Sequence, residues 1–207
     1  MTEPGPVHGL PGLGHGPPGP RQGPPRPANG PPGPGHGLPE PEQGPTGPGH
    51  GPPGPAGEAT PADRGWLGEA IELSRRSPPS ATAFSVGAIV VAGDGSVLAT
   101  GYSREGGPLD HAEEAALAKL NPADPRLASA TLYSSLEPCR FRASRPHPCA
   151  ELIIGAGLRR VVIAWREPPV FAPGVGAALL AEAGITVVEI AGLAAQARAV
   201  NADVLGR

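Results

Sequence analysis

Downstream of residue 60, apolar and polar residues alternate with periods that predict both helices and strands. A helical period over residues 63–77 brings Trp66 and the apolar residues that follow it to one face, and the segment SPPS ends this helix. Residues 84–92 and 96–103 are mostly small or β-branched, and the turn GDG separates them. They predict a hairpin of two strands.

Further along the chain the two patterns alternate. Helical patterns cover residues 111–120, 147–158, 174–185 and 193–205. Strand patterns cover residues 130–136, 159–165 and 186–190. Because strands and helices alternate, we expect an α/β fold with three layers, α/β/α, in which helices cover both faces of a mixed sheet.

The first 60 residues differ in composition from the rest. They hold 17 of the 32 glycines and 19 of the 31 prolines. Such a segment has too few apolar groups to offset the entropy lost on ordering, so we expect residues 1–60 to be a disordered tail and residues 61–207 to form one domain. Four histidines in the tail each precede a glycine, and their isolation favours a solvated linker over a metal site.

Charge and hydropathy exclude several functional classes. The net charge is −3 and the predicted domain is nearly neutral, so nucleic acid is not expected as a partner. No apolar run reaches the length of a membrane span, and the N-terminus lacks a signal peptide, so we expect a cytoplasmic protein without membrane contact. In a reducing compartment, two cysteines indicate free thiols, metal ligands or catalytic groups rather than a disulfide.

Four residues combine into a candidate metal site. His111 and Glu113 begin one predicted helix; Cys139 and Cys149 flank a loop, and Cys149 begins the next helix, where the thiolate is favoured. One His and two Cys leave a fourth zinc position open for water, as catalysis requires. Zinc lowers the pKa of that water, and Glu113 is placed to transfer its proton.

Each of these residues also has an ordinary explanation. His111 alone fits a surface position, the cysteines fit buried core thiols or a disulfide, and Glu113 fits a first-turn carboxylate favoured by the helix dipole. The joint order, HAE on a helix and then EPC and PC before another helix, is typical of zinc-dependent base deaminases, although nine residues rather than two separate the cysteines. A non-catalytic zinc-stabilised binding module is the alternative from another class, but it does not need Glu113.

At these motifs the sequence resembles the cytidine/deoxycytidylate deaminase superfamily, and most closely the fungal-type diaminopyrimidine deaminases of riboflavin biosynthesis. That family has SPP…FCVGA, GYSRE…HAE, EPCSxRxSGxxPC, EP…F and AGI…V…GL. This chain has, in the same order over about residues 65–195, SPPSATAFSVGAIVV, GYSREGGPLDHAEEAAL, LEPCRFRASRPHPC, WREPPVF and AGITVVEIAGL. The resemblance implies a cytidine-deaminase-like fold for residues 61–207, and it accounts for the long loop between the cysteines.

The resemblance also implies roles for individual residues. His111, Cys139 and Cys149 correspond to the family's zinc ligands, and Glu113 corresponds to its proton shuttle. Four further residues match polar positions expected to bind the substrate: Ser103, Arg104, Arg142 and Ser144. Arginine grips phosphate bidentately, so an anionic substrate fits this loop, although a solvated charged loop explains any one of its arginines equally well.

Three departures from the family pattern bear on the substrate. Ser85 replaces a cysteine, Arg140 a serine and Arg145 a glycine, the last two in the cysteine loop. The expected activity is hydrolytic deamination of a phosphorylated aminopyrimidine: the ribitylamino-diaminopyrimidine phosphate of riboflavin biosynthesis or, as the alternative, a deoxycytidylate- or cytidine-type nucleotide. No reductase domain follows Arg207, so we expect the deaminase to act alone; since members of this superfamily commonly self-associate, we also expect a homo-oligomer.

Overall fold

A computed structural model of the protein describes residues 50–55, 57–168 and 175–206. Most of the predicted disordered tail lies outside these residues. The described helices are α1 (Pro61–Ser74), α2 (Ala112–Leu117), η1 (Pro125–Ser129), α3 (Cys149–Gly155), α4 (Gly176–Glu182), η2 (Ala191–Leu193), α5 (Ala194–Val200) and α6 (Ala202–Leu205). The described strands are β1 (Gly87–Val91), β2 (Val97–Tyr102), β3 (Thr131–Ser134), β4 (Arg160–Ile163) and β5 (Thr186–Glu189).

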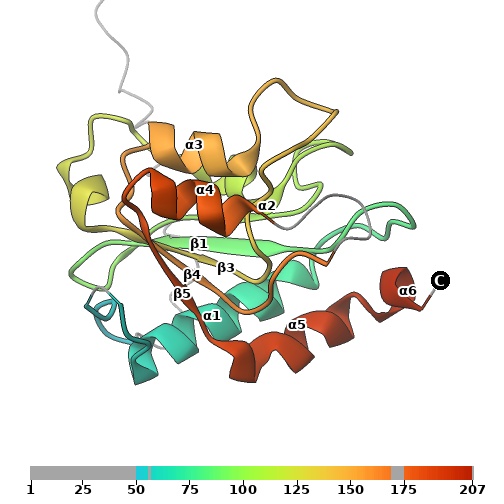
Figure 1. The fold of residues 1–207 in the computed structure, drawn as a ribbon, viewed down its shortest axis with the longest axis horizontal. Coiled ribbons are helices and arrows are strands. Elements are labelled where there is room, and N and C mark those ends of the chain that lie inside the picture. Colours follow the sequence, from blue (N-terminus) through green and yellow to red (C-terminus); the bar gives the residue numbers. More distant parts are fainter. Residues whose placement is uncertain (1–49, 56, 169–174, 207) are drawn as a thin grey trace, which may run out of the picture. The chain divides into compact units, whose positions relative to one another are not determined.

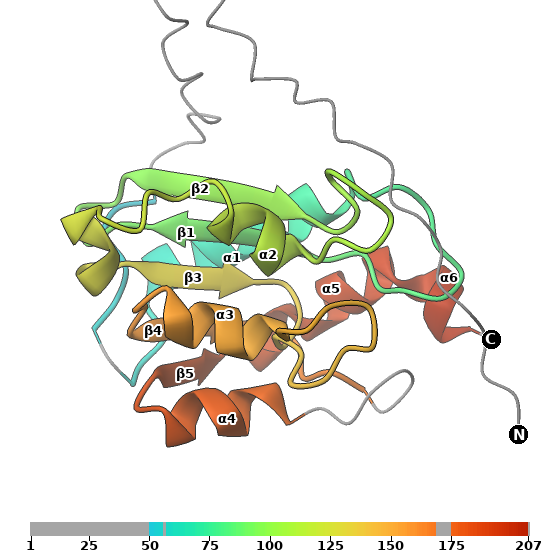
Figure 2. The same cartoon turned by 90° about the horizontal axis from the view of Figure 1, so that it is seen from above.

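The five strands form one mixed sheet in the order β2-β1-β3-β4-β5 (Figure 2). Strand β1 pairs antiparallel with both β2 and β3, whereas β3, β4 and β5 run parallel to one another. Helices α2, α3 and α4 cover one face of the sheet, and α1 and α5 cover the other (Figure 1). The predicted three-layer α/β/α architecture is therefore confirmed.

Burial follows from this layering. All five residues of β1 are buried, as expected for a strand covered on both faces. Helix α1 begins with a capping box between Thr60 and Asp63, and it buries Trp66, Leu67 and Ile71. A Cβ atom at Gly101 would collide with the backbone of α2, so the close approach of α2 to β2 requires glycine at this position.

A buried ion pair joins α1 to the sheet. Asp63 is fully buried; it accepts a hydrogen bond of 2.8 Å from Arg160 at the start of β4 and one of 2.7 Å from the Tyr133 hydroxyl. Burial alone raises the pKa of Asp63, but the hydrogen bonds from Arg160, Tyr133 and Thr60 outweigh it and lower that pKa far below its usual range.

Residues just before Pro61, which the sequence assigned to the tail, contact α1. The indole Nε1 of Trp66 donates to the Gly51 carbonyl at 2.9 Å, and the His50 ring packs edge-on against the indole. Arg160 donates to the Glu58 carbonyl at 3.0 Å. The last part of the range predicted as tail therefore contributes contacts to the domain.

One predicted element is divided. The helical pattern over 193–205 forms η2, α5 and α6, with an interruption at Asn201. The Asn201 side chain accepts a hydrogen bond from the Ser85 amide and donates one to the Ser85 carbonyl, at 2.7 and 3.0 Å. This contact fixes Asn201 outside helical geometry. None of the helices in the described ranges combines the length and apolarity needed to cross a bilayer.

Candidate active site

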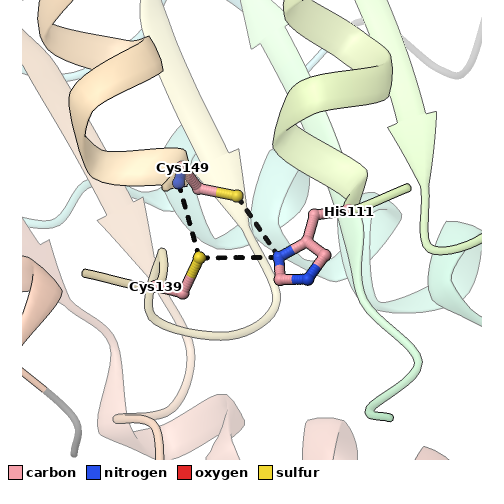
Figure 3. Close-up of side chains that lie close together, drawn as sticks. All are labelled: His111, Cys139 and Cys149. Carbon is pink, nitrogen blue, oxygen red and sulfur yellow. Dashed lines mark hydrogen bonds between the residues drawn. The ribbon is translucent and has the colours of Figure 1, made fainter. Parts of the chain in front are cut away.

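The three predicted metal ligands meet on the face of the sheet that carries α2 and α3 (Figure 3). His111 is the N-cap residue of α2, Cys139 follows β3, and Cys149 is the first residue of α3. The His111 Nδ1 atom lies 3.5 Å from the Cys139 sulfur and 3.4 Å from the Cys149 sulfur. All three ligand atoms lie within 4.8 Å of one another.

This donor set fits zinc. Zn–S and Zn–N bonds of about 2.3 and 2.0 Å at tetrahedral angles separate the ligand atoms by about 3.5 Å, which matches the spacing observed here. Both cysteines are free, so they form no disulfide with each other. Among the described residues, no further His, Cys, Asp or Glu joins the group, which leaves a fourth position for water.

The cysteines differ in acidity. Hydrogen bonding from Cys149, and also from His111, lowers the pKa of Cys139 to about 4 despite its burial. The Cys149 backbone N–H also donates to the Cys139 sulfur at 3.4 Å. The hydrogen bond to Cys139, together with burial, raises the pKa of Cys149. The site thus holds one thiolate readily, and the second thiol loses its proton when metal binds.

Glu113 lies beside this group, in the first turn of α2. Glu113 is only 3% exposed, and burial raises the pKa of its carboxyl group. Ser134, the last residue of β3, donates a hydrogen bond of 2.7 Å to Glu113 Oε1. The serine therefore orients one carboxyl oxygen and leaves the other for proton transfer.

A pocket of about 410 Å³ opens onto these residues. His111, Glu113 and Cys139 line it, whereas Cys149 is fully buried behind them. The four residues predicted to bind substrate also line the pocket: Ser103, Arg104, Arg142 and Ser144. The structure thus brings every candidate site residue to one place, and a pocket of this size is typical of small-molecule sites.

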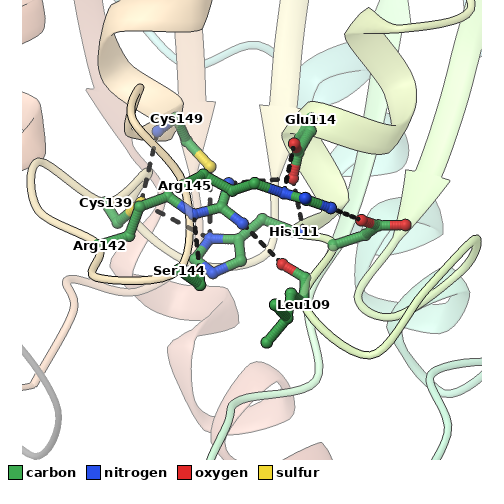
Figure 4. A network of polar contacts seen from close by, with 9 residues as sticks. Leu109, His111, Glu114, Cys139, Arg142, Ser144, Arg145 and Cys149 are labelled. Atoms are coloured by element: carbon green, nitrogen blue, oxygen red, sulfur yellow. Dashed lines mark hydrogen bonds and ion pairs between the residues drawn. The ribbon is translucent and has the colours of Figure 1, made fainter.

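Arg142 ties the cysteine loop to the start of α2 (Figure 4). Its side chain is 3% exposed, and its guanidinium donates to Glu114 at 3.0 Å, to the Leu109 carbonyl at 2.6 Å and to Ser144 at 3.3 Å. The contacts seen here are internal, so substrate binding by Arg142 and Ser144 stays a prediction.

Arg145, which replaces a glycine of the family pattern, strengthens the same connection. Its guanidinium contacts Asp110 at 2.8 Å and Glu114 at 3.3 Å. Arg140, the other departure in this loop, stacks over the ring of Phe141. The two substituted positions therefore make ionic and aromatic contacts in the cysteine loop.

Ser103 and Arg104 hold another wall of the pocket. The Ser103 hydroxyl accepts a hydrogen bond from the Val86 amide at 3.0 Å. Arg104 donates to the carbonyls of Pro78 and Phe84, and to the Ser85 hydroxyl at 3.0 Å. The serine at position 85 thus supplies an acceptor for Arg104, which gives this departure from the family pattern a structural role.

Two glutamates that line the pocket, the buried Glu137 and the partly buried Glu167, were missed by sequence reasoning. Glu137 accepts hydrogen bonds from the amides of Ala177 and Glu167, at 2.8 and 3.0 Å. Glu167 lines the pocket; burial, and after it the negative charge of Cys139, Glu113 and Glu137, raises its pKa to about 8. Both precede a proline in motifs singled out above, EPC and WREPP, but no local pattern places them at a pocket.

Comparison with known proteins agrees with this geometry. Residues 61–165 match the model of the cytidine and deoxycytidylate deaminase zinc-binding region, a range that includes His111, Cys139 and Cys149. The chain is 40% identical over 124 residues to a diaminohydroxyphosphoribosylamino-pyrimidine deaminase of Schizosaccharomyces pombe. This match covers 58% of the chain but only 30% of the yeast protein.

Solved structures show the same fold. Acinetobacter baumannii RibD superposes with a TM-score of 0.59 and 30% identity, covering 70% of this chain and 39% of that protein. The Rib2 deaminase of Aspergillus oryzae superposes with a TM-score of 0.56 and 26% identity, covering 69% of this chain and 98% of that one. Because the family match spans more than half of the chain and contains the metal-ligand group, the chain belongs to the cytidine and deoxycytidylate deaminase family.

Proposed function

We propose that the protein is a zinc-dependent hydrolase that deaminates a phosphorylated aminopyrimidine. The observation that carries this proposal is the position of the Glu113 carboxyl group in the same pocket as His111 and Cys139. A structural zinc site needs no such acid, whereas hydrolysis of an aminopyrimidine needs a group that moves protons between water and the ring.

The three metal ligands and Glu113 have different roles in the reaction. When held by His111, Cys139 and Cys149, zinc lowers the pKa of a water molecule towards neutrality and so provides hydroxide. Glu113 takes the first water proton and delivers it to the ring nitrogen beside the reacting carbon. It then carries the second water proton to the amino nitrogen. The carbon gains a C–O bond and loses its C–N bond, ammonia leaves, and the ring keeps a carbonyl group.

Ser134 positions this proton carrier. Its hydroxyl donates a hydrogen bond to Glu113 Oε1, so we assign proton transfer to the other carboxyl oxygen, Oε2. Burial raises the pKa of Glu113, which brings the acid and base forms of the carboxyl closer in energy near neutral pH and suits a group that both accepts and donates protons.

We propose the ribitylamino-diaminopyrimidine phosphate as the substrate. Similarity to the Schizosaccharomyces pombe deaminase supports it, as does similarity to the Aspergillus oryzae Rib2 deaminase, which has been solved with DARIPP. Four polar residues of the pocket wall are the candidates to hold its tail: Ser103, Arg104, Arg142 and Ser144. Deoxycytidylate is the second candidate, since it also joins an aminopyrimidine to a phosphorylated sugar. Self-association and a cytoplasmic location stay predictions.

Ammonia release by the zinc-loaded protein tests the proposal. The ribitylamino-diaminopyrimidine phosphate and deoxycytidylate are offered separately to the wild type, to Glu113→Gln and to Glu151→Gln, a control on the exposed side of α3. We expect turnover by the wild type and the control, and none by Glu113→Gln although it binds zinc. Zinc binding without turnover of either compound would favour the non-catalytic module instead.

A further inference from the structure

One carboxyl oxygen of Glu167 receives no hydrogen bond from the described residues. Glu167 follows β4 and lines the pocket. Its backbone amide donates to Glu137, but its own Oε2 atom is buried and has no hydrogen-bond partner among the described residues. A buried carboxyl oxygen without a donor is unfavourable, so this atom requires an explanation.

The arginines nearby are directed to other acceptors. Arg104 donates to Pro78, Phe84 and Ser85, and Arg142 donates to Glu114, Leu109 and Ser144, as described above. Arg166, next to Glu167 in the chain, pairs with Glu189 at 2.8 Å and approaches Glu137 at 3.9 Å. The donor that Glu167 lacks is therefore one that an occupant of the pocket can bring.

The two candidate substrates differ in the hydrogen-bond donors that they present to such an acceptor. In both, one amino group reacts at the metal centre and is unavailable. Besides that amino group, the base of deoxycytidylate has a carbonyl oxygen, a ring nitrogen that accepts hydrogen bonds, and C–H groups, but no N–H group. The diaminopyrimidine also has a carbonyl oxygen and an acceptor nitrogen, but it keeps three kinds of donor: another amino group, a ring N–H and the N–H that carries its tail. A carboxylate accepts hydrogen bonds from N–H groups and is repelled by a carbonyl oxygen.

We propose that Glu167 determines substrate specificity by accepting a hydrogen bond from an N–H donor of the diaminopyrimidine ring, a donor that the cytosine ring lacks. This inference rests on the proposed function and goes beyond it, because it assigns the choice between the two candidate substrates to one side chain. An N–H donor favours the charged form of the carboxyl group and so offsets the raised pKa of Glu167.

Steady-state kinetics of Glu167→Met and Glu167→Gln test the assignment, with Glu189→Gln as the matched control. Glu189 pairs with Arg166 at the end of β5 and is not a pocket residue. Loss of a charge-assisted hydrogen bond should lower kcat/KM for the diaminopyrimidine about 10- to 100-fold in Glu167→Met. Turnover of deoxycytidylate should not fall. An equal fall for both compounds, or no fall for either, would overturn the assignment.

A binding measurement keeps the inference separate from the proposed activity. Calorimetry with triaminopyrimidinone, the substrate ring without its tail, and with 1-methylcytosine, whose N1 carries no hydrogen, as in deoxycytidylate, requires no turnover. We expect Glu167→Met to weaken triaminopyrimidinone binding at least 10-fold and to leave 1-methylcytosine binding unchanged. Equal affinity of the wild type and Glu167→Met for triaminopyrimidinone contradicts the role of Glu167 whatever the activity. Absence of ammonia release by the wild type contradicts only the proposed function.

Discussion

The hydrogen bond from Ser134 to Glu113 provides a quantitative test of how the pocket positions its proton carrier. Both residues are almost completely buried, and the hydroxyl lies 2.7 Å from Glu113 Oε1. A hydrogen bond to a charged group contributes about 1.5–3 kcal/mol. If Ser134→Ala removes this contribution from the transition state, kcat/KM falls about 10- to 150-fold, while zinc binding is retained.

The neighbouring serine gives a matched control. Ser135 is also buried, but its hydroxyl accepts a hydrogen bond from the Gly87 amide and does not contact Glu113. Ser135→Ala should therefore lower stability without lowering kcat/KM comparably. Ammonia release, zinc content and urea unfolding are measured for both variants. Wild-type activity in Ser134→Ala, or equal losses of activity in the two variants, would refute the positioning role.

Three further predictions concern the framework and the metal. Asp63→Asn should destabilise the protein by about 3–5 kcal/mol in urea unfolding, because it leaves Arg160 without its buried partner. Since the pKa of Asp63 is lowered in the folded protein, its contribution is present above the ordinary value of 3.8 and should be lost as pH falls below it, which acid titration of the wild type and Asp63→Asn can compare. Chelation of zinc should abolish ammonia release and expose two titratable thiols, at Cys139 and Cys149, and added zinc should reverse both effects. Arg142→Met should leave Glu114 paired with Arg145 alone and lower stability by about 1–3 kcal/mol; unchanged urea unfolding would show that the Arg142–Glu114 contact contributes nothing.

The sequence predicted the parts of the site that follow from local spacing. His111 and Glu113 are two residues apart at a helix start, so the beginning of α2 alone fixes their relation. Cys149 opens α3 directly after a proline, and the strand before Cys139 was recognisable from its β-branched and aromatic residues. These local patterns were enough to anticipate the ligand group and the layered fold.

The parts that sequence reasoning missed depend on contacts between distant segments. Ser134 meets Glu113 only because the end of β3 lies next to the start of α2, and the hydrogen bond between Glu137 and Glu167 spans thirty residues. The break at Asn201 likewise results from its contact with Ser85, 116 residues away. No periodicity encodes such pairings, because the register of the sheet and the course of the loops decide them.

The decisive measurement is ammonia release from the ribitylamino-diaminopyrimidine phosphate, compared between the zinc-loaded wild type and Glu113→Gln. We expect turnover by the wild type and, for Glu113→Gln, unchanged zinc content with activity at least 100-fold lower. Undiminished turnover by Glu113→Gln would contradict the assignment of Glu113 as the proton carrier. No turnover of this compound by a fully zinc-loaded wild type would contradict the proposed substrate.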